Sequence, residues 1–370
     1  MTVHAGNKKL RGVNLGGWLV LEKWMTPSLF HGLTAEDETA FCIELGDSAQ
    51  RILQTHWQTF ITRDDFAWLA EIGINAVRIP IGHWIFGGDY PYHARYGHTN
   101  APYVVGGLEI LDQAFAWALA FDIKIVLDLH AAPGSQNGFD NSGMKDVCEW
   151  HTQAQYLTHS LDVLERLAKR YAAHPALHGI QVLNEPRWDI PTDYLKHYTL
   201  LAYQRIRHYC AADRVAVIFH DGFRSFRDYT GFMQEPDYEN VILDIHRYQC
   251  FTSEDVNADI FTHIRKAADQ WKCEADEIIS DLRHKTYVGE WSLGLDLKMM
   301  TLWSESLLSD DSKEMDAFQI HQAYRGYAAA QLLTFEKYLG WFFWSYKTET
   351  MPQWSFCDCV KAGWMPQKFN

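Results

Sequence analysis

Eight short apolar runs, separated by longer stretches with helical spacing, limit the fold of this chain more than any other feature of its sequence. Runs rich in Val, Ile and Leu are typical of parallel strands that are buried on both faces. Eight strands that alternate with helices predict an α/β fold, a (β/α)8 TIM barrel, and we expect residues 1–370 to form a single domain with elaborated loops. The expected strands are Leu10–Gly17, Ala76–Ile81, Ile123–His130, Leu177–Glu185, Val215–Asp221, Val241–Tyr248, Tyr287–Trp291 and Gly340–Tyr346. The expected helices include Leu161–Tyr171, Tyr198–Tyr209 and Ala317–Tyr338.

Polar and aromatic side chains stand at the ends of five of these runs, and Arg78 stands inside the second run. A barrel carries the ends of its strands to one rim, where barrel active sites lie. One such residue alone would be consistent with a structural ion pair, but five strands that share the feature favour an active site. The residues at the strand ends are Asp128, His130, Asn184, Glu185, His246, Tyr248, Glu290 and Trp344.

The charge balance excludes some partners. Lys and Arg number 33 and Asp and Glu number 47, which gives a net charge of −14. Nucleic acids and anionic membranes are bound by basic surfaces, so we expect neither as a partner. No run of 18 apolar residues predicts a membrane span. The 15 Trp, 18 Tyr and 20 Phe residues indicate either a large aromatic core or a binding cleft lined with rings.

The cellular location is an expectation from two weak signals. Residues 1–11 lack the apolar core of a signal peptide. The seven cysteines are scattered and odd in number, which predicts free, buried thiols in a reducing compartment. We expect a cytoplasmic monomer, and secretion stays open if a leader has been removed.

Glu185 and Glu290 form the central pair of candidate catalytic residues. They lie on the expected fourth and seventh strands, so their carboxylates can converge over one substrate. Hydrolysis of a glycosidic bond needs such a pair, one acid to protonate the leaving oxygen and one nucleophile or base. The sequence leaves open whether the pair has the spacing of a retaining or an inverting enzyme.

Neighbouring residues suit this chemistry. A cation such as Arg78 would keep a nucleophilic carboxylate ionised, although a salt bridge on the barrel floor is the alternative role. Tyr248 can donate a hydrogen bond to the same carboxylate, and Asn184 can bind a sugar hydroxyl. Trp188 and Trp344 can supply apolar walls for the acid.

His130 and His246 also allow a metal site, with Asp128 and the two glutamates as further ligands. The first expected strand, RGVNLGG, lacks the His-x-His pair of metal-dependent barrel hydrolases. We therefore expect no metal and no other cofactor, and we expect both histidines to bind sugar hydroxyls or the carboxylates.

At this point the chain resembles glycoside hydrolase family 5, and within it the exo-1,3-β-glucanases. Among the stretches that match the family, 11–30 and 128–143 are long and specific, whereas an Asn-Glu-Pro sequence alone would be weak evidence of membership. The stretches are RGVNLGGWLVLEKWMTPSLF (11–30), NAVRIPIGHW (75–84), DLHAAPGSQNGFDNSG (128–143), VLNEP (182–186), HRYQCF (246–251), VGEWS (288–292) and GWFFWSYKTE (340–349).

The resemblance implies a retaining glycosidase with Glu185 as acid/base and Glu290 as nucleophile, which releases glucose from the non-reducing end of 1,3-β-glucans or short β-glucosides. Glu22 would bind the outer hydroxyls of the terminal glucose, and Phe139 and Phe251 would clamp the next sugar. The remaining positions implied to bind substrate are Trp24, Arg78, His130, Asp140, Asn141, Asn184, His246, Tyr248 and Trp344.

Several positions depart from the pattern of this subfamily and leave alternatives open. Trp24 and Tyr346 replace a usual Tyr and Trp, Arg187-Trp188 replaces a smaller pair, and Arg247 and Cys250 alter the loop after the sixth strand. A preference for 1,6- or 1,4-linked glucosides or glycolipids is therefore an alternative. A non-catalytic sugar-binding barrel is a further alternative, which two opposed carboxylates disfavour.

Overall fold

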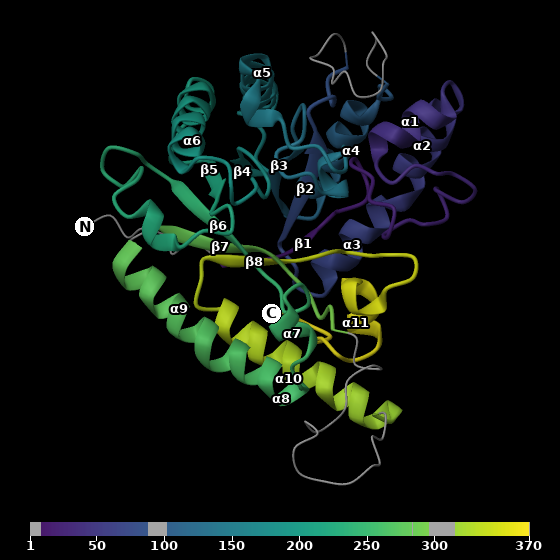
Figure 1. The fold of residues 1–370 in the computed structure, drawn as a ribbon, viewed down its shortest axis with the longest axis vertical. Coiled ribbons are helices and arrows are strands. Elements are labelled where there is room, and N and C mark those ends of the chain that lie inside the picture. Colours follow the sequence, from purple (N-terminus) through teal and green to yellow (C-terminus); the bar gives the residue numbers. More distant parts are fainter. Residues whose placement is uncertain (1–8, 88–101, 283, 296–314, 370) are drawn as a thin grey trace.

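The computed structural model describes residues 9–87, 102–282, 284–295 and 315–369. Eight parallel strands close into a barrel in the order of the sequence, and helices lie around it (Figure 1). The predicted (β/α)8 barrel is thus confirmed. The strands are β1 (Leu10–Asn14), β2 (Ala76–Gly82), β3 (Lys124–Ala131), β4 (Leu177–Gln181), β5 (Ala216–His220), β6 (Val241–Arg247), β7 (Lys285–Trp291) and β8 (Gly340–Phe343).

The predicted fourth strand was wrong at its carboxyl end. β4 stops at Gln181, so Asn184 and Glu185 lie beyond it. Two backbone bonds still hold this segment to its neighbours, from the N–H of Val182 to Ile218 and from the N–H of Asn184 to Leu129. The chain then turns at Glu185, which has a φ of +40°, a conformation that costs energy for a residue with a side chain. The predicted first and eighth strands were also too long, because β1 and β8 end at Asn14 and Phe343.

Helices cover the outside of the barrel, and the three predicted helices lie within or close to observed ones. The last of them begins at Ala317 as predicted because Asp316 and Gln319 form a capping box there. The helices are α1 (Glu38–Leu45), α2 (Ser48–Phe60), α3 (Arg63–Glu71), α4 (Gly107–Ala120), α5 (Ala154–Tyr171), α6 (Thr192–Arg207), α7 (Ser253–Val256), α8 (Ile260–Arg265), α9 (Trp271–Glu277), α10 (Ala317–Phe335) and α11 (Phe356–Lys361). One π-helical turn, η5 (Lys266–Gln270), lies between α8 and α9, and a second, η6 (Ile278–Leu282), follows α9.

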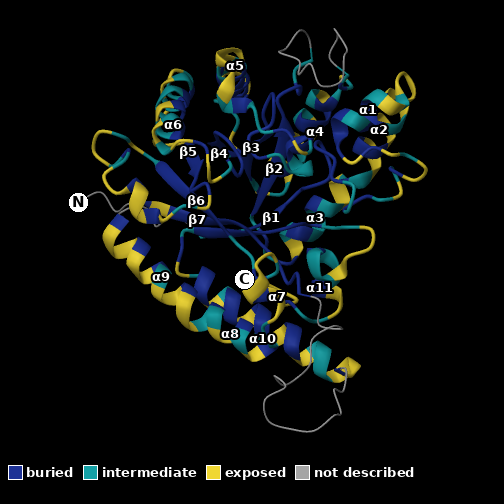
Figure 2. Cartoon of the chain, viewed as in Figure 1, coloured by how far each residue is buried: buried dark blue, intermediate teal, exposed yellow. Residues whose placement is uncertain are grey.

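The interior of the barrel is apolar at one end and polar at the other. Leu10, Ala76, Ile218, Ile242 and Phe342 belong to one buried cluster. Side chains two positions apart on a strand share a face, so the residues above this floor also point inward. They include Arg78 above Ala76 and His246 above Ile242. Figure 2 shows the strands buried and the helices exposed on their outer faces.

Other expectations have mixed outcomes. All seven cysteines are free, but Cys273 is exposed, and only Cys42, Cys210 and Cys359 are buried. Within the described part of the chain, no helix has the length and apolar character needed to span a membrane. From its sequence, the stretch Leu293–Asp316 is interpreted as a loop beside the seventh strand, and most of it lies outside the described residues.

Candidate active site

Glu290 lies near the carboxyl end of β7 and is held by two donors. Its Oε1 accepts a hydrogen bond from Arg78 Nη1 at 2.9 Å, and its Oε2 accepts one from Tyr248 Oη at 2.8 Å. Glu290 is 4% exposed, so these bonds form away from bulk water. The preceding Gly289 is required because a Cβ there would lie 2.1 Å from Oδ1 of Asp244.

Arg78, in the middle of β2, is buried with all its charge compensated. Its guanidinium lies within 3.0 Å of Oδ2 of Asp128 as well as of Glu290. Three side-chain amides complete the set of acceptors, and they belong to Asn14, Gln181 and Asn184. Arg78 therefore has both of the roles considered for it. It forms a buried ion pair, and it lies beside a candidate catalytic carboxylate.

The two glutamates come together at His246, near the end of β6. Its Nδ1 lies 2.7 Å from Oε1 of Glu185 and 3.5 Å from Oε2 of Glu290. These two oxygens are therefore at most about 6.2 Å apart, the sum of the two distances. Retaining glycosidases hold their carboxyl groups about 5–5.5 Å apart and inverting ones about 6.5–9.5 Å. The bound lies below the inverting range, which favours the retaining spacing.

The charges of the site follow from these contacts. Burial lowers the pKa of His246, but the carboxylates of Glu290 and Asp244 outweigh it and raise that pKa to about 10. Burial raises the pKa of Glu185, but the hydrogen bond and the positive charge of His246, with smaller contributions from His130 and Asn141, together outweigh it and leave the pKa below its usual value. Burial raises the pKa of Glu290, although the charges of His246 and Arg78 oppose the shift. At neutral pH, His246 is thus an imidazolium beside an ionised Glu185.

His130 and Trp344 form a second wall of the site. Their rings are stacked, with centroids 5.3 Å apart and planes 5° from parallel. His130 Nδ1 is bound to Oδ2 of Asp128 at 2.6 Å, which fixes the ring. Gln136 ties this wall to the catalytic segment, because its Nε2 donates to the carbonyls of His130 and Asn184.

Acidic side chains of the site lie in the loops that follow β1 and β3. Glu22 is 5% exposed, and its Oε2 accepts a hydrogen bond from Nε1 of Trp24 at 2.8 Å. Burial, and next the charge of Asp140, raise the pKa of Glu22 well above its usual value. Asn141 donates to Oε2 of Glu185 at 3.1 Å. The structure thus brings the predicted residues of both loops to the two glutamates.

Aromatic rings lie at the mouth of the site. Trp354 packs against Trp24 and Tyr248, each with a centroid separation of 5.4 Å, and against Phe251 at 6.3 Å. Phe251 is 72% exposed, whereas Phe139 is half-buried. Some of the aromatic rings that could line a binding cleft therefore lie together at this position.

The departures from the subfamily pattern have local partners. Arg187 forms a bidentate pair with Asp189. Trp188 is 60% exposed, which does not fit the predicted apolar wall for the acid. Arg247 binds Glu274 of α9 and the carbonyl of His246. Tyr346 donates to Asp65 at the start of α3.

Five buried residues of the site were missed by sequence reasoning. Four of them lie within strands, where the two-residue periodicity of inward-facing side chains was the signal that could have found them, and they are Asn14, Gln181, His220 and Asp244. The fifth, Gln136, lies in the loop after β3, where strand periodicity gives no signal.

One trio has the composition of a metal site. A carboxylate oxygen of Glu185 and one ring nitrogen each of His220 and His246 lie within 4.8 Å of one another. A metal-bound histidine donates its other ring N–H to an acceptor. Nδ1 of His220 instead accepts a hydrogen bond from the N–H of Gly222, which leaves its proton on Nε2. The trio therefore does not fit a metal ion in this arrangement.

A closed (β/α)8 barrel with two buried glutamates at its carboxyl rim is the architecture of a barrel glycosidase. A sequence model of the family described as cellulase (glycosyl hydrolase family 5) matches residues 39–349. The chain belongs to glycosyl hydrolase family 5, as the resemblance predicted. It is 36% identical to a glucan 1,3-beta-glucosidase of Blumeria graminis over 393 residues, with 98% of this chain and 88% of that protein covered. It is 35% identical to one of Schwanniomyces occidentalis over 396 residues, with the same coverage.

Solved structures support the fold. The rutinosidase from Aspergillus niger superposes with a TM-score of 0.76 at 20% identity and covers 96% of this chain and 97% of its own. Cel5A of Thermotoga maritima superposes with a TM-score of 0.56 at 14% identity and covers 95% of this chain and 96% of its own. At such identities the likeness concerns the fold alone.

Proposed function

We propose that the protein is a retaining β-glucosidase that releases glucose from the non-reducing end of 1,3-β-glucans or short β-glucosides. The single observation that carries the proposal is the pair of glutamates joined by His246, with oxygens at most about 6.2 Å apart. The names of the curated relatives support the 1,3 linkage.

The first step forms a glycosyl-enzyme. An oxygen of Glu290 bonds to the anomeric carbon of the terminal glucose while the bond from that carbon to the leaving oxygen breaks. Glu185 gives its proton to the leaving oxygen, and the aglycone departs as an alcohol. Arg78 and Tyr248, both bonded to Glu290, hold the nucleophile in place and favour its ionised form.

The second step returns the enzyme to its starting state. Glu185, now ionised, takes a proton from a water molecule that attacks the anomeric carbon. The bond from that carbon to Glu290 breaks, and glucose leaves with its β configuration retained. Asn184, bonded to Arg78, is placed to bind the hydroxyl beside the reacting carbon.

His246 can supply the proton that Glu185 needs for the first step. Nδ1 of His246 lies 2.7 Å from Oε1 of Glu185, and transfer of its proton converts a charged pair into a neutral pair. When a sugar fills the site and expels water, the lower dielectric favours the neutral pair. Substrate binding therefore puts Glu185 into the acid form that the first step needs.

The polar loops after β1 and β3 support cleavage at the end of a glucan chain. Glu22, Asp140 and Asn141 are polar groups that can bind the outer hydroxyls of one terminal sugar. A raised pKa lets Glu22 donate as well as accept a hydrogen bond there. Because these groups come from the loops after β1 and β3, they would close the site beyond the terminal glucose.

The setting of the protein is a further proposal. The seven free cysteines support a reducing compartment such as the cytoplasm. The net charge of −14 supports a neutral sugar substrate over nucleic acid or an anionic membrane surface. We propose that a monomer is active, and light scattering on the eluting protein checks this.

The experiment is a hydrolysis panel of β-1,2-, 1,3-, 1,4- and 1,6-linked glucose disaccharides with laminaritriose, followed by product identity over time. We expect laminaribiose to be cleaved best, and laminaritriose to give glucose and laminaribiose first. Better cleavage of another linkage would support the alternative specificity, which Arg187 and Trp188 on the loop after Glu185 favour. Binding of these sugars without any turnover would support the non-catalytic alternative.

A further inference from the structure

His220, the last residue of β5, is a buried histidine that the mechanism above does not use. It is 4% exposed, and its ring packs edge to face on that of His246, with centroids 4.3 Å apart. Its Nδ1 accepts a hydrogen bond of 2.8 Å from the N–H of Gly222. Nε2 is buried and has no hydrogen-bond partner among the described residues.

The proton position on His220 follows from these contacts. A backbone N–H can only donate, so Nδ1 carries no proton and a neutral ring holds its proton on Nε2. Burial, and next the positive charge of His246, hold the pKa of His220 well below its usual value, so the ring is neutral. Among the described residues, Nε2–H is therefore a buried donor without an acceptor, an arrangement that costs free energy unless the donor is used.

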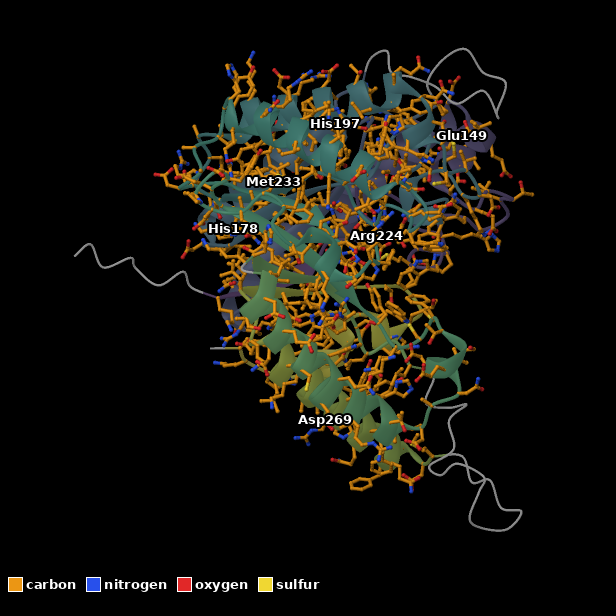
Figure 3. All side chains as sticks on the ribbon, turned by 60° about the vertical axis from the view of Figure 1, so that its left-hand side comes forward. Glu149, His178, His197, Arg224, Met233 and Asp269 are labelled. Atoms are coloured by element: carbon orange, nitrogen blue, oxygen red, sulfur yellow. The ribbon has the colours of Figure 1, made fainter. Side chains whose placement is uncertain are left out.

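The backbone holds the ring of His220 near Glu185. A ring nitrogen of His220 lies within 4.8 Å of a carboxylate oxygen of Glu185. Arg224, which is labelled in Figure 3, holds the two loops together, because its guanidinium donates to the carbonyls of Gly222 and Trp188. Gly222 has a φ of +63°, and a Cβ there would lie 3.2 Å from the carbonyl oxygen of Pro186. The loop after β5 is thus packed tightly against the segment that carries Glu185.

The proposed reaction creates a need for such a donor. In the first step one proton leaves with the aglycone, and it passes from Nδ1 of His246 through Glu185. His246 is then neutral and keeps its remaining proton on Nε2, which faces Asp244 at 3.2 Å. Its bare Nδ1 now faces the ionised Glu185, so two acceptors oppose each other. The carboxylate has lost its main donor at the moment when it must act as a base.

We propose that His220 is a positioning residue whose Nε2–H donates to the Glu185 carboxylate in the glycosyl-enzyme. This inference rests on the proposed function. A short movement of the Glu185 side chain toward β5 makes the bond, which stabilises the ionised base and holds it for the attacking water. The other charged or titratable groups around the two histidines are Arg78, Asp221, Arg224, Asp244, Arg247 and Glu290.

The test compares His220→Asn with His220→Gln. Asn keeps an acceptor near Nδ1 for the N–H of Gly222 but has no donor at the position of Nε2, whereas Gln reaches that position with an N–H. The substrate is 2,4-dinitrophenyl β-glucoside, whose leaving group needs no protonation, so kcat reports the second step. The pH profiles of kcat and of kcat/KM are measured for the wild type and both variants.

Loss of the donor raises the pKa of Glu185 in the glycosyl-enzyme only. For His220→Asn we expect the acidic limb of kcat to move up by about one pH unit, so that kcat falls by up to about tenfold on that limb and changes little at neutral pH. The acidic limb of kcat/KM, which reports the free enzyme, should stay in place. His220→Gln should keep both limbs of the wild type.

Two outcomes would overturn the inference. They are an unmoved kcat limb in His220→Asn, or equal shifts in both variants, which indicate a structural role. Thermal melting shows whether each variant folds, and His220→Met is the second variant without a donor if His220→Asn does not. A wild type that releases no dinitrophenolate contradicts the proposed function itself, whereas an active wild type with unshifted variants contradicts only the role of His220.

Discussion

His246 donates from Nδ1 to Oε1 of Glu185 at 2.7 Å, and the same nitrogen lies 3.5 Å from Oε2 of Glu290. One imidazolium therefore stands between the two candidate catalytic carboxylates. Its charge offsets their mutual repulsion, which would otherwise favour the protonation of one of them. The pair can thus lie at the close spacing of a retaining glycosidase while both groups are buried.

Glu290→Gln removes the proposed nucleophile and keeps its size. We expect turnover of an aryl β-glucoside to fall by about 10⁴-fold or more, because no glycosyl-enzyme can form. Binding of laminaribiose, measured by calorimetry, should survive, since the amide oxygen still accepts a hydrogen bond from Arg78 and the amide NH2 can donate to the hydroxyl of Tyr248. Near-normal turnover in this variant would contradict the assignment.

Glu185→Ala separates proton donation from nucleophilic attack. Turnover of laminaribiose should fall about 10²–10⁴-fold, because its leaving oxygen needs a proton. The first step with dinitrophenyl glucoside should suffer much less, and azide should partly restore turnover by replacing the water that Glu185 activates. The measurement is kcat/KM for the two substrates side by side. Equal losses on both would count against the acid/base role.

Arg78→Met tests the cation beside Glu290. Arg78 lowers the pKa of Glu290, so its removal should raise that pKa and move the acidic limb of kcat/KM to higher pH, by about one unit or more. Arg78→Lys keeps the charge and should shift the limb less. Both variants should be less stable, by about 3–5 kcal/mol for Met, since Asp128 and Glu290 lose a buried partner. An unmoved limb in folded Arg78→Met would show that the guanidinium does not tune the nucleophile.

Glu38→Gln should change how stability depends on pH. Burial raises the pKa of Glu38 to about 8, although the hydrogen bond from the N–H of Leu21 opposes this shift. A carboxyl with a raised pKa stabilises the fold below its unfolded pKa, and this contribution is lost as pH rises through about 8. The variant should therefore gain stability over the wild type between pH 5 and pH 8.5, by up to about 4 kcal/mol. Urea unfolding at both pH values measures it, and an equal difference at each pH would be the contrary result.

Strand periodicity and motif together predicted the barrel and the convergence of Glu185, Glu290, Arg78 and Tyr248. This was possible because buried parallel strands read as apolar runs, and a polar residue that ends such a run has few places to go except the rim. The resemblance supplied Glu22 and Asn141, whose loops carry no periodic signal.

For other residues the sequence carries only part of the information. Strand periodicity could have marked His220 and Asp244 as facing inward, but only the register of β5 beside β6 places them opposite each other. The end of β4 was misjudged because Val182 and Leu183 are apolar although they lie beyond the strand. The exposure of Trp188 was missed because an aromatic side chain next to a catalytic segment suits a wall and a surface equally well.

The central claim is that Glu290 forms a covalent bond to the sugar. The most direct measurement incubates the protein with 2,4-dinitrophenyl 2-deoxy-2-fluoro-β-glucoside, whose glycosyl-enzyme hydrolyses slowly, and maps the labelled peptide by mass spectrometry. We predict one fluoroglucosyl group on Glu290 in the wild type and none in Glu290→Gln. A label on another carboxylate, or no label in a protein that still hydrolyses aryl β-glucosides, would contradict the account.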